Sequence, residues 1–180
     1  IQPDILLCRT SRNLPLDLKA KIALFTNVPI EAVITARDAS SIYEIPLNFA
    51  GERLDSIILR KLGLATCGPD LSRWQKLVET VYHPRDEVTI AIVGKYTGLR
   101  DSYLSLYQAL DHGGVGNSLR VNLDWIEDED LEKGSYLRRL KDQDGILVPG
   151  GFGQRGVEGK IRAVKYAREK KVPFFGICLG

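Results

Sequence analysis

The chain has 180 residues, of which 44% are hydrophobic and 27% are charged, which is enough apolar material for one or two globular domains. Its 25 basic and 23 acidic residues are interspersed and give a net charge of +2, so the composition excludes the strongly basic surface of a nucleic-acid-binding protein. No apolar run approaches the roughly 20 residues of a membrane helix, and the first residues lack a signal pattern. These observations predict a soluble cytoplasmic protein with neither nucleic acid nor membrane as a partner.

The first third of the chain has the hydrophobic pattern of a small β-α-β unit. Its predicted elements are a strand, a helix introduced by Pro15 and Asp17, a short strand, a loop or edge piece, and an amphipathic helix: residues 4–9, 16–25, 32–34, 41–47 and 54–62. The composition then shifts to glycine, proline and polar residues, with a short helix predicted over 74–81. We interpret this stretch as an interdomain linker.

The second half of the chain alternates strictly between predicted strands and helices. In chain order these elements are residues 88–93, 102–112, 119–125, 131–140, 145–148, 157–170 and 173–177. Short apolar strands separated by helices of this kind are typical of a parallel, doubly wound sheet, whose ligands bind at the carboxyl ends of the strands. We therefore predict an α/β protein with two incomplete parallel-sheet units, residues 1–66 and 87–180, joined by an interdomain linker over 67–86.

A glycine-rich segment, residues 149–156 (PGGFGQRG), follows the third strand of the second unit. Bare backbone N–H groups at the carboxyl end of a strand can face an anion or an oxyanion. A plain turn from strand to helix would also account for the glycines. The segment lacks the Lys-Ser/Thr pair of a phosphate-binding P-loop, which disfavours nucleotide binding of that type.

A cysteine follows the last predicted strand, within residues 176–180 (GICLG). Small residues two positions before and two positions after a nucleophile are what a sharp strand-to-helix elbow requires, because larger side chains would collide in the turn. We therefore predict that Cys178 is a nucleophile and that the backbone N–H of Leu179 can donate to an oxyanion.

The other candidates for chemistry have ordinary structural explanations. A thiol nucleophile normally needs a histidine as its base, and the chain has only His83, in the linker, and His112, at the end of a helix. We expect neither to be catalytic, so the base is expected outside this chain. Cys8 and Cys67 are interpreted as structural thiols, and the cysteine spacing predicts no metal site.

Several segments, taken together, resemble the CTP synthase family. Three segments resemble the family's class I glutamine amidotransferase domain: residues 149–153 (PGGFG), 155–160 (RGVEGK) and 176–180 (GICLG). A fourth segment, residues 93–103 (VGKYTGLRDSY), resembles the opening strand and helix of that domain. Three more are similar to the end of the family's synthetase, or amidoligase, domain: residues 1–9, 21–25 and 41–46. The resemblance covers essentially the whole chain.

The resemblance implies a ligase of pyrimidine biosynthesis that makes CTP from UTP. In this family ATP with Mg²⁺ phosphorylates the uracil O4, ammonia from glutamine displaces the phosphate, and GTP activates glutamine hydrolysis in a homotetramer. The family's phosphate-binding loop and magnesium ligands would lie before Ile1, and its catalytic His and Glu would lie after Gly180. The 180 residues alone are therefore expected to catalyse neither half-reaction.

The resemblance also implies roles for individual residues. In the amidotransferase part these are Cys178 as the nucleophile, Gly151 and Leu179 as oxyanion-hole donors, Gly151, Phe152 and Leu179 beside the glutamine, and Arg155 in the response to GTP. In the synthetase part they are Lys21 and Phe25 for UTP or CTP, and Arg9, Arg37, Asp38 and Ala39 for ATP. From the residues alone, a surface lysine and a solvated turn pair would explain Lys21 and Arg37–Asp38 as well.

Other hypotheses stay open at this point. The chain could be another amidotransferase or a cysteine hydrolase with the same elbow, although the synthetase-like first third speaks against this. It could also be a non-catalytic assembly or regulatory module derived from an amidotransferase, which would act by association alone. Retained binding of nucleotide or of a glutamine analogue would separate these. Finally, the 180 residues could be one stretch of a longer chain, to which the family's function applies in full.

Overall fold

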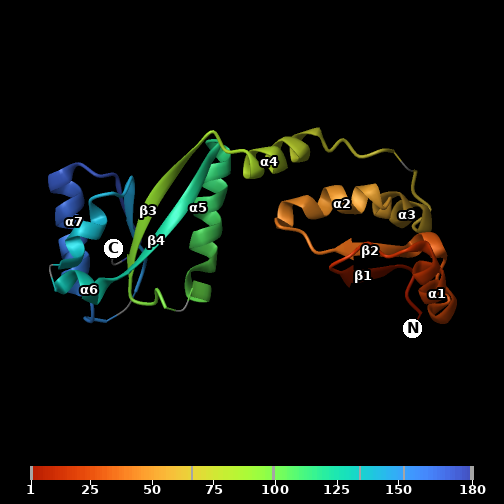
Figure 1. Cartoon of the computed structure of the whole chain (residues 1–180), viewed down its shortest axis with the longest axis horizontal. Helices are drawn as coiled ribbons and strands as arrows, with labels where there is room; N and C mark the ends of the chain where they lie inside the picture. The colour runs from red at the N-terminus through yellow and green to blue at the C-terminus, as the bar shows by residue number, and fades with distance from the viewer. Residues whose placement is uncertain (1, 66, 99, 134, 152, 179–180) are drawn as a thin grey trace. The chain divides into compact units, whose positions relative to one another are not determined.

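The structure is a computed structural model that describes residues 2–65, 67–98, 100–133, 135–151 and 153–178. The chain divides into two compact units, Ile1–Glu79 and Thr80–Gly180. Figure 1 labels their elements. The division falls within helix α4 (Ser72–Tyr82), inside the stretch interpreted as a linker. In the described part of the chain, no helix has the length and apolar character needed to cross a membrane.

The first unit contains two parallel strands, β1 (Leu6–Thr10) and β2 (Val33–Arg37), paired in register from Leu6 with Val33 to Thr10 with Arg37. The connection between them carries α1 (Leu16–Thr26) and the 3-10 helix η1 (Ile30–Ala32). Pro15 suits the N-terminus of α1 because proline lacks a backbone N–H, and an N–H at this position would have no helical partner. Asn27 ends the helix in the left-handed conformation. The predicted β-α-β unit is confirmed.

The prediction for residues 41–47 is wrong, because this stretch is helical rather than a loop or edge piece. The 3-10 helix η2 (Ile42–Glu44) leads into α2 (Ile45–Gly51), and α3 (Leu54–Lys61) follows. The Ser41 hydroxyl accepts a hydrogen bond from the Tyr43 N–H, and the Glu44 carboxylate accepts one from the Ser41 N–H. This capping box starts η2, and Pro46 in the first turn suits the N-terminal end of α2, which follows it.

The core of the first unit lies between β2 and the helices that cover it. Its buried apolar residues are Ala23, Val28, Ala32, Val33, Ile34 and Ile57. The first turns of α4 are also attached to this unit, since the Trp74 indole N–H donates to the Tyr43 carbonyl at 2.5 Å and the two rings lie 6.4 Å apart. Helix α4 begins at Ser72, two residues before the start predicted at residue 74.

The second unit is a four-stranded parallel sheet with helices on both faces (Figure 1). The strands are β3 (Asp86–Gly94), β4 (Leu119–Glu127), β5 (Gly145–Val148) and β6 (Phe174–Gly176), in the spatial order β4-β3-β5-β6. Helix α5 (Leu104–Gly116) covers one face, and α6 (Asp128–Glu132) and α7 (Val157–Lys170) cover the other. The predicted doubly wound α/β fold is confirmed.

The strand order also predicts where a ligand binds. From β3 the chain crosses to β4 on one side and then to β5 and β6 on the other, so the direction of winding reverses beside β3. At such a reversal the connections after neighbouring strands diverge and leave a crevice at the carboxyl ends. The crevice of this sheet therefore lies after β3 and β5.

Two helices of the second unit differ from their predicted bounds. Helix α5 continues four residues past the predicted end at 112, and it includes Gly114, where a Cβ atom would lie 2.8 Å from the Leu119 carbonyl oxygen. The glycine thus lets α5 approach β4 closely. The single helix predicted over 131–140 is instead α6 followed by the 3-10 helix η4 (Ser135–Leu140).

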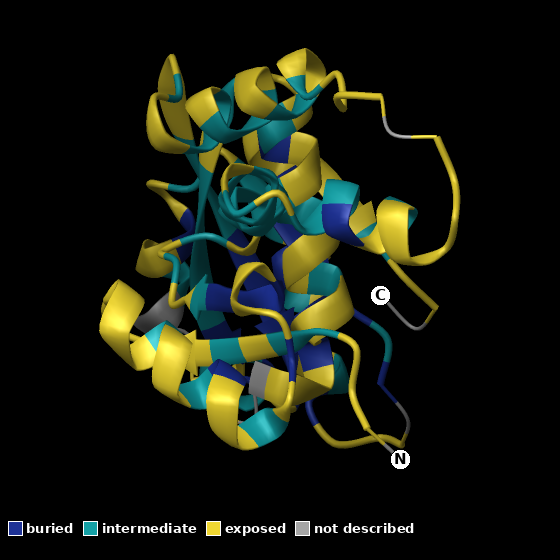
Figure 2. Cartoon of the chain, turned by 90° about the vertical axis from the view of Figure 1, so that its right-hand side faces the viewer, coloured by how far each residue is buried: buried dark blue, intermediate teal, exposed yellow. Residues whose placement is uncertain are grey.

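The core of the second unit lies between the sheet and α7. Figure 2 colours each residue by burial and shows exposed residues along the outer sides of the helices. The buried residues of this cluster are Ala91, Val93, Ile126, Leu131, Leu140, Ile146, Val148, Ala163 and Ala167. Each large side chain among them contributes about 1.5–3 kcal/mol by burial. On the strand β4, Trp125 stacks on Tyr103 with ring centroids 5.7 Å apart.

Candidate active site at the carboxyl edge of the second sheet

Cys178 lies just past β6 in a strained backbone conformation. Its φ is +58°, in the left-handed region that residues with a side chain rarely adopt. The Ile177 N–H donates to the Val148 carbonyl at 3.0 Å, so pairing with β5 continues up to the residue before the cysteine. The thiol itself is exposed. A strained residue that carries an exposed thiol at a strand end has the geometry of a nucleophile elbow.

The glycine-rich segment brings bare backbone next to this cysteine. A Cβ atom on Gly150 would lie 3.4 Å from the Cβ atom of Cys178. Gly151 is buried, and Gly153 and Gly156 have φ values of +82° and +74° that favour glycine. The sequence therefore uses glycine here both for close approach to the thiol and for left-handed turns.

Two of the residues predicted to act with Cys178 lie outside the described residues. They are Phe152, predicted to border the glutamine, and Leu179, predicted as an oxyanion donor and glutamine contact. Their roles stay predictions.

Three charged side chains are buried beneath the glycine-rich segment: Lys95, Asp128 and Lys160, which are 5%, 0% and 4% exposed. They come from the end of β3, the start of α6 and the first turn of α7. The Lys95 ammonium donates to the Gly153 carbonyl at 2.8 Å. Among the described residues, the Lys160 ammonium and both carboxylate oxygens of Asp128 have no hydrogen-bond partner.

Burial dominates the protonation behaviour of this cluster. It lowers the pKa of Lys160, because a poorly solvated ammonium is disfavoured, and although Asp128 and Cys178 oppose this effect, Lys95 adds to it. Burial likewise raises the pKa of Asp128, against the opposing charge of Lys160. The cluster thus holds two basic groups and one acidic group with little water, at the crevice edge of the sheet.

Asp128 also fixes the position of α7. A Cβ atom on Gly156 would lie 2.1 Å from the Asp128 carboxyl carbon, and one on Gly159 would lie 1.7 Å from the Asp128 carbonyl oxygen. The first turn of α7 therefore packs directly on Asp128, and a carboxylate in this place interacts favourably with the helix dipole.

The sequence analysis did not predict the buried cluster of Lys95, Asp128 and Lys160, although Lys95 and Lys160 lie in segments that carried the family resemblance.

Arg155 ties the glycine-rich segment to its surroundings. Its guanidinium donates to Glu129 Oε1 at 2.9 Å and to the Lys95 carbonyl at 3.5 Å, while the side chain stays 59% exposed. The segment is therefore attached to α6 and to the end of β3 through one surface residue. A role for Arg155 in a response to GTP stays a prediction.

The two histidines lie at the other end of the parallel strands from Cys178. His83 precedes β3, and His112 lies in the last turns of α5, which return the chain to the start of β4. Cys178, by contrast, follows the carboxyl end of β6. That neither histidine is the base for the thiol stays a prediction.

A pocket of about 380 Å³ in the first unit collects the four residues predicted to contact ATP. Arg9, Arg37, Asp38 and Ala39 line it, together with Leu7, Ala36, Ile42 and Ile45. The Arg9 guanidinium donates to Asp38 Oδ1 at 3.0 Å, and the Asp38 N–H donates to the Thr10 carbonyl at 2.9 Å. Apolar walls beside a guanidinium suit a flat aromatic ring such as a nucleobase.

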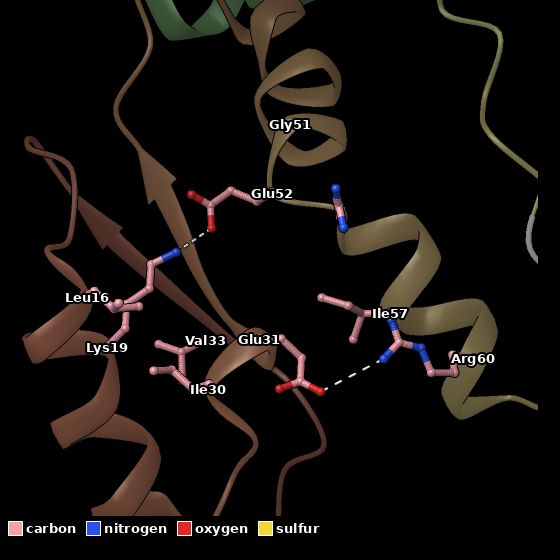
Figure 3. Close-up of a pocket in the computed structure, with 10 residues that line it drawn as sticks. Leu16, Lys19, Ile30, Glu31, Val33, Gly51, Glu52, Ile57 and Arg60 are labelled. Carbon is pink, nitrogen blue, oxygen red and sulfur yellow. Dashed lines mark hydrogen bonds and ion pairs between the residues drawn. The ribbon is translucent and has the colours of Figure 1, made fainter.

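Lys21 and Phe25, predicted to contact UTP or CTP, both lie exposed on α1, and Phe25 is 81% exposed. They line neither the pocket beside Arg9 nor a larger one of about 540 Å³ shown in Figure 3. The structure thus leaves these two residues apart from both pockets.

Four of the charged side chains that line the pocket in Figure 3 form two ion pairs. Lys19 Nζ lies 2.5 Å from Glu52 Oε2, and Arg60 Nη1 lies 3.9 Å from Glu31 Oε1. Burial raises the pKa of Glu52, but the Lys19 ammonium and the Thr35 N–H outweigh it, so the net pKa is below the usual range. These ion pairs are a structural feature of the first unit.

In the described part of the chain, no group of three or more His, Cys, Asp or Glu could hold a metal ion.

Comparison with known proteins gives matches along both units. The family model described as "Glutamine amidotransferase class-I" matches residues 99–180, and the model described as "CTP synthase N-terminus" matches residues 1–64. A solved structure, "Trypanosoma brucei CTPS - glutaminase domain with bound acivicin", is 39% identical with a TM-score of 0.49, over 52% of this chain and 37% of that one.

Curated relatives match the chain over its full length. Proteins named CTP synthase from Acidobacterium capsulatum, Koribacter versatilis and Symbiobacterium thermophilum are 61%, 56% and 52% identical to it. In each case all of this chain is covered, together with 33%, 33% and 34% of the relative. The chain therefore spans about a third of the length of the curated relatives that it matches.

Proposed function

Because the chain belongs to the CTP synthase family, we propose that it is the part of such an enzyme that joins amination of UTP to hydrolysis of glutamine. Residues 1–66 would end the synthetase domain, 67–86 would link the domains, and 87–180 would begin the amidotransferase domain. A non-catalytic module is not favoured, because the matches extend over both units. The full-length protein would be a cytoplasmic homotetramer.

The observation that carries the proposal is the strained, exposed Cys178 beside the bare backbone of Gly150. In the proposed reaction the Cys178 sulfur attacks the amide carbon of glutamine, and the backbone N–H groups of Gly151 and Leu179 stabilise the resulting oxyanion. Phe152 would border the substrate. Ammonia leaves, and water later releases glutamate from the thioester. Arg155 would adjust the glycine-rich segment in response to GTP.

The first unit would contribute to the nucleotide sites. The pocket beside Arg9 fits an adenine ring of ATP, with Arg37, Asp38 and Ala39 at its edge. Lys21 and Phe25 would contact UTP or CTP on the exposed side of α1. The described residues offer no ligand set for Mg²⁺, so none of them is assigned to the metal that accompanies ATP in the proposed reaction.

Formation of CTP by the full-length protein tests the proposal directly. With UTP, ATP and Mg²⁺, we expect CTP to form with either glutamine or ammonium salt as the nitrogen donor, and GTP to raise only the glutamine-dependent rate. The measurement is the amount of CTP separated by anion-exchange chromatography. Absence of CTP with both donors would contradict the synthetase assignment. Absence with glutamine alone would contradict the amidotransferase assignment.

Changing Asp38 to asparagine is expected to raise the KM for ATP about 3- to 10-fold, because Arg9 loses the charge that holds it at the pocket. Steady-state kinetics of the full-length enzyme with ammonia as donor measure this effect. Asp4→Asn is the matched control, since Asp4 pairs with Lys61 at 3.3 Å in the same unit and does not line this pocket. An equal rise in KM for both variants would remove the ATP assignment.

A further inference from the structure

Lys160 presents an unusual combination of burial and lack of partners. Its side chain lies in the first turn of α7, the residue is 4% exposed, and its ammonium has no hydrogen-bond partner among the described residues. An isolated buried ammonium is costly, because the lost hydration is not replaced. Such a group in a native fold therefore calls for an explanation, and a missing anionic or carbonyl partner is one.

The surroundings of the Lys160 ammonium point toward the thiol site. A Cβ atom on Gly151 would lie 3.4 Å from Nζ, so the ammonium is next to the backbone that is proposed to donate to the oxyanion. The charged and titratable groups that act on it are Asp128, Lys95 and Cys178, from three different elements. One side of the ammonium thus faces the glycine-rich segment, and the Cys178 site lies within range of its charge.

Neither Lys95 nor Asp128 forms a hydrogen bond with the Lys160 ammonium. Lys95 is bonded to the Gly153 carbonyl, and Asp128 packs its carboxyl carbon against Gly156 without a hydrogen bond to Lys160. Burial disfavours the charged forms of both Lys160 and Asp128. An anion formed at Cys178 would stabilise the Lys160 ammonium and be stabilised by it.

We propose that Lys160 is a positioning residue of the glutamine site, whose buried ammonium packs beside the Gly151 backbone and balances the negative charge that forms at Cys178 and on the substrate oxygen. The proposal rests on the proposed function, since it deepens the role of that same site. Lys160 acts through Gly151 and through its charge, not by contact with the reacting atoms.

The chemistry requires such a charge at two moments. The attacking species is the thiolate, and when the sulfur–carbon bond forms, the π electron pair of the amide carbonyl moves onto oxygen, so the negative charge passes from sulfur to oxygen. When the carbon–nitrogen bond breaks, the carbonyl re-forms and the nitrogen leaves as ammonia with the proton that the thiol gave to the base. A fixed ammonium with little surrounding water stabilises both anions without reorganisation.

Alkylation of Cys178 with an anionic and a neutral reagent tests the charge directly in the full-length enzyme. Iodoacetate and iodoacetamide form the same kind of sulfur–carbon bond, so the ratio of their rates reports the local field rather than the position of the thiol. We expect Lys160→Met to lower the ratio of iodoacetate to iodoacetamide rates about fivefold. The matched control is Lys165→Met on the same helix, where the side chain is 64% exposed, and its ratio should equal that of the wild type.

Steady-state kinetics of the Lys160 variants give a second test of the proposal. Lys160→Met should lower the glutamine-dependent kcat about 10- to 100-fold, change the KM for glutamine less than about threefold, and leave ammonia-dependent CTP formation unchanged. Lys160→Arg should restore part of the kcat and the alkylation ratio, because it keeps the charge. An unchanged alkylation ratio, or a loss of ammonia-dependent activity as large as that with glutamine, would overturn the proposal.

Two further outcomes keep the proposal separable from folding and from the proposed function. Lys160→Gln is a second neutral variant. If both neutral variants lose their circular dichroism signal while Lys165→Met keeps it, the ammonium is a requirement for folding, and the proposal is overturned. A different outcome is expected if the proposed function itself is wrong. In that case the wild-type enzyme would form no CTP from glutamine although Cys178 is alkylated.

Discussion

Replacing Cys178 with serine is expected to lower glutamine-dependent CTP formation by the full-length enzyme at least about 1,000-fold and to leave ammonia-dependent formation within about twofold of the wild type. The physical reason is that a serine hydroxyl is far less acidic and less nucleophilic than a thiol, so much less of the attacking anion forms. The measurement is CTP formed with each nitrogen donor at saturating UTP and ATP. The strained φ of +58° at this position should survive the change, since serine is almost the same size.

The controls for this prediction are the other two cysteines. Cys8→Ser lies in β1, and Cys67→Ser lies in an exposed part of the segment between the sheets. Both should keep glutamine-dependent activity. Loss of activity with ammonia in Cys178→Ser would mean that the change disturbs the synthetase part, and full activity with glutamine would mean that another group is the nucleophile.

The second large effect is expected from Gly159→Ala in α7. The added methyl group would lie 1.7 Å from the Asp128 carbonyl oxygen, closer than any real contact, so α6 and α7 must move apart. Overpacking against backbone rather than against a flexible side chain costs more than is usual, and we expect a loss above about 3 kcal/mol in the free energy of unfolding. Differential scanning calorimetry of the full-length protein, with the yield of soluble protein, measures the loss.

Gly113→Ala is the matched control for this substitution. It also lies in a helix, α5, but among the residues that the structure describes no atom outside the neighbouring helix backbone lies within 4 Å of the added methyl group. Alanine there should stabilise the protein by about 0.5–1 kcal/mol because it restricts the unfolded chain. Equal melting temperatures for the Gly159→Ala variant and the wild type would show that α6 yields easily, and that the contact between Asp128 and α7 is not rigid.

The sequence predicts the parts of this molecule that depend on local pattern. The alternation of short apolar runs with helical periods gives the doubly wound sheet, because each strand and its crossover helix leave separate signals. The elbow at Cys178 follows from two small residues at fixed offsets. The pocket beside Arg9 followed from family resemblance alone, since a solvated turn would leave the same sequence.

Other parts depend on contacts that the sequence does not display. The sequence pattern around Asp128 is that of the acidic start of an ordinary surface helix. Asp128 is nevertheless fully buried, because Gly156 and Gly159 let α7 pack against it. Lys160 likewise reads as a solvated residue of an amphipathic helix. By contrast, the helical stretch that begins with η2 and continues into α2 had a local signal in the capping box of Ser41 and Glu44, and the apolar, β-branched character of its neighbours concealed it.

The two tryptophans of the chain are divided between its two units. Trp74 donates to the Tyr43 carbonyl in the first unit, and Trp125 stacks on Tyr103 in the second. Each unit therefore has its own fluorophore in a distinct environment. With either indole replaced by phenylalanine, the emission of the other would follow one unit of these 180 residues alone, so that two variants would report separately on the unit with the pocket beside Arg9 and on the unit with the thiol.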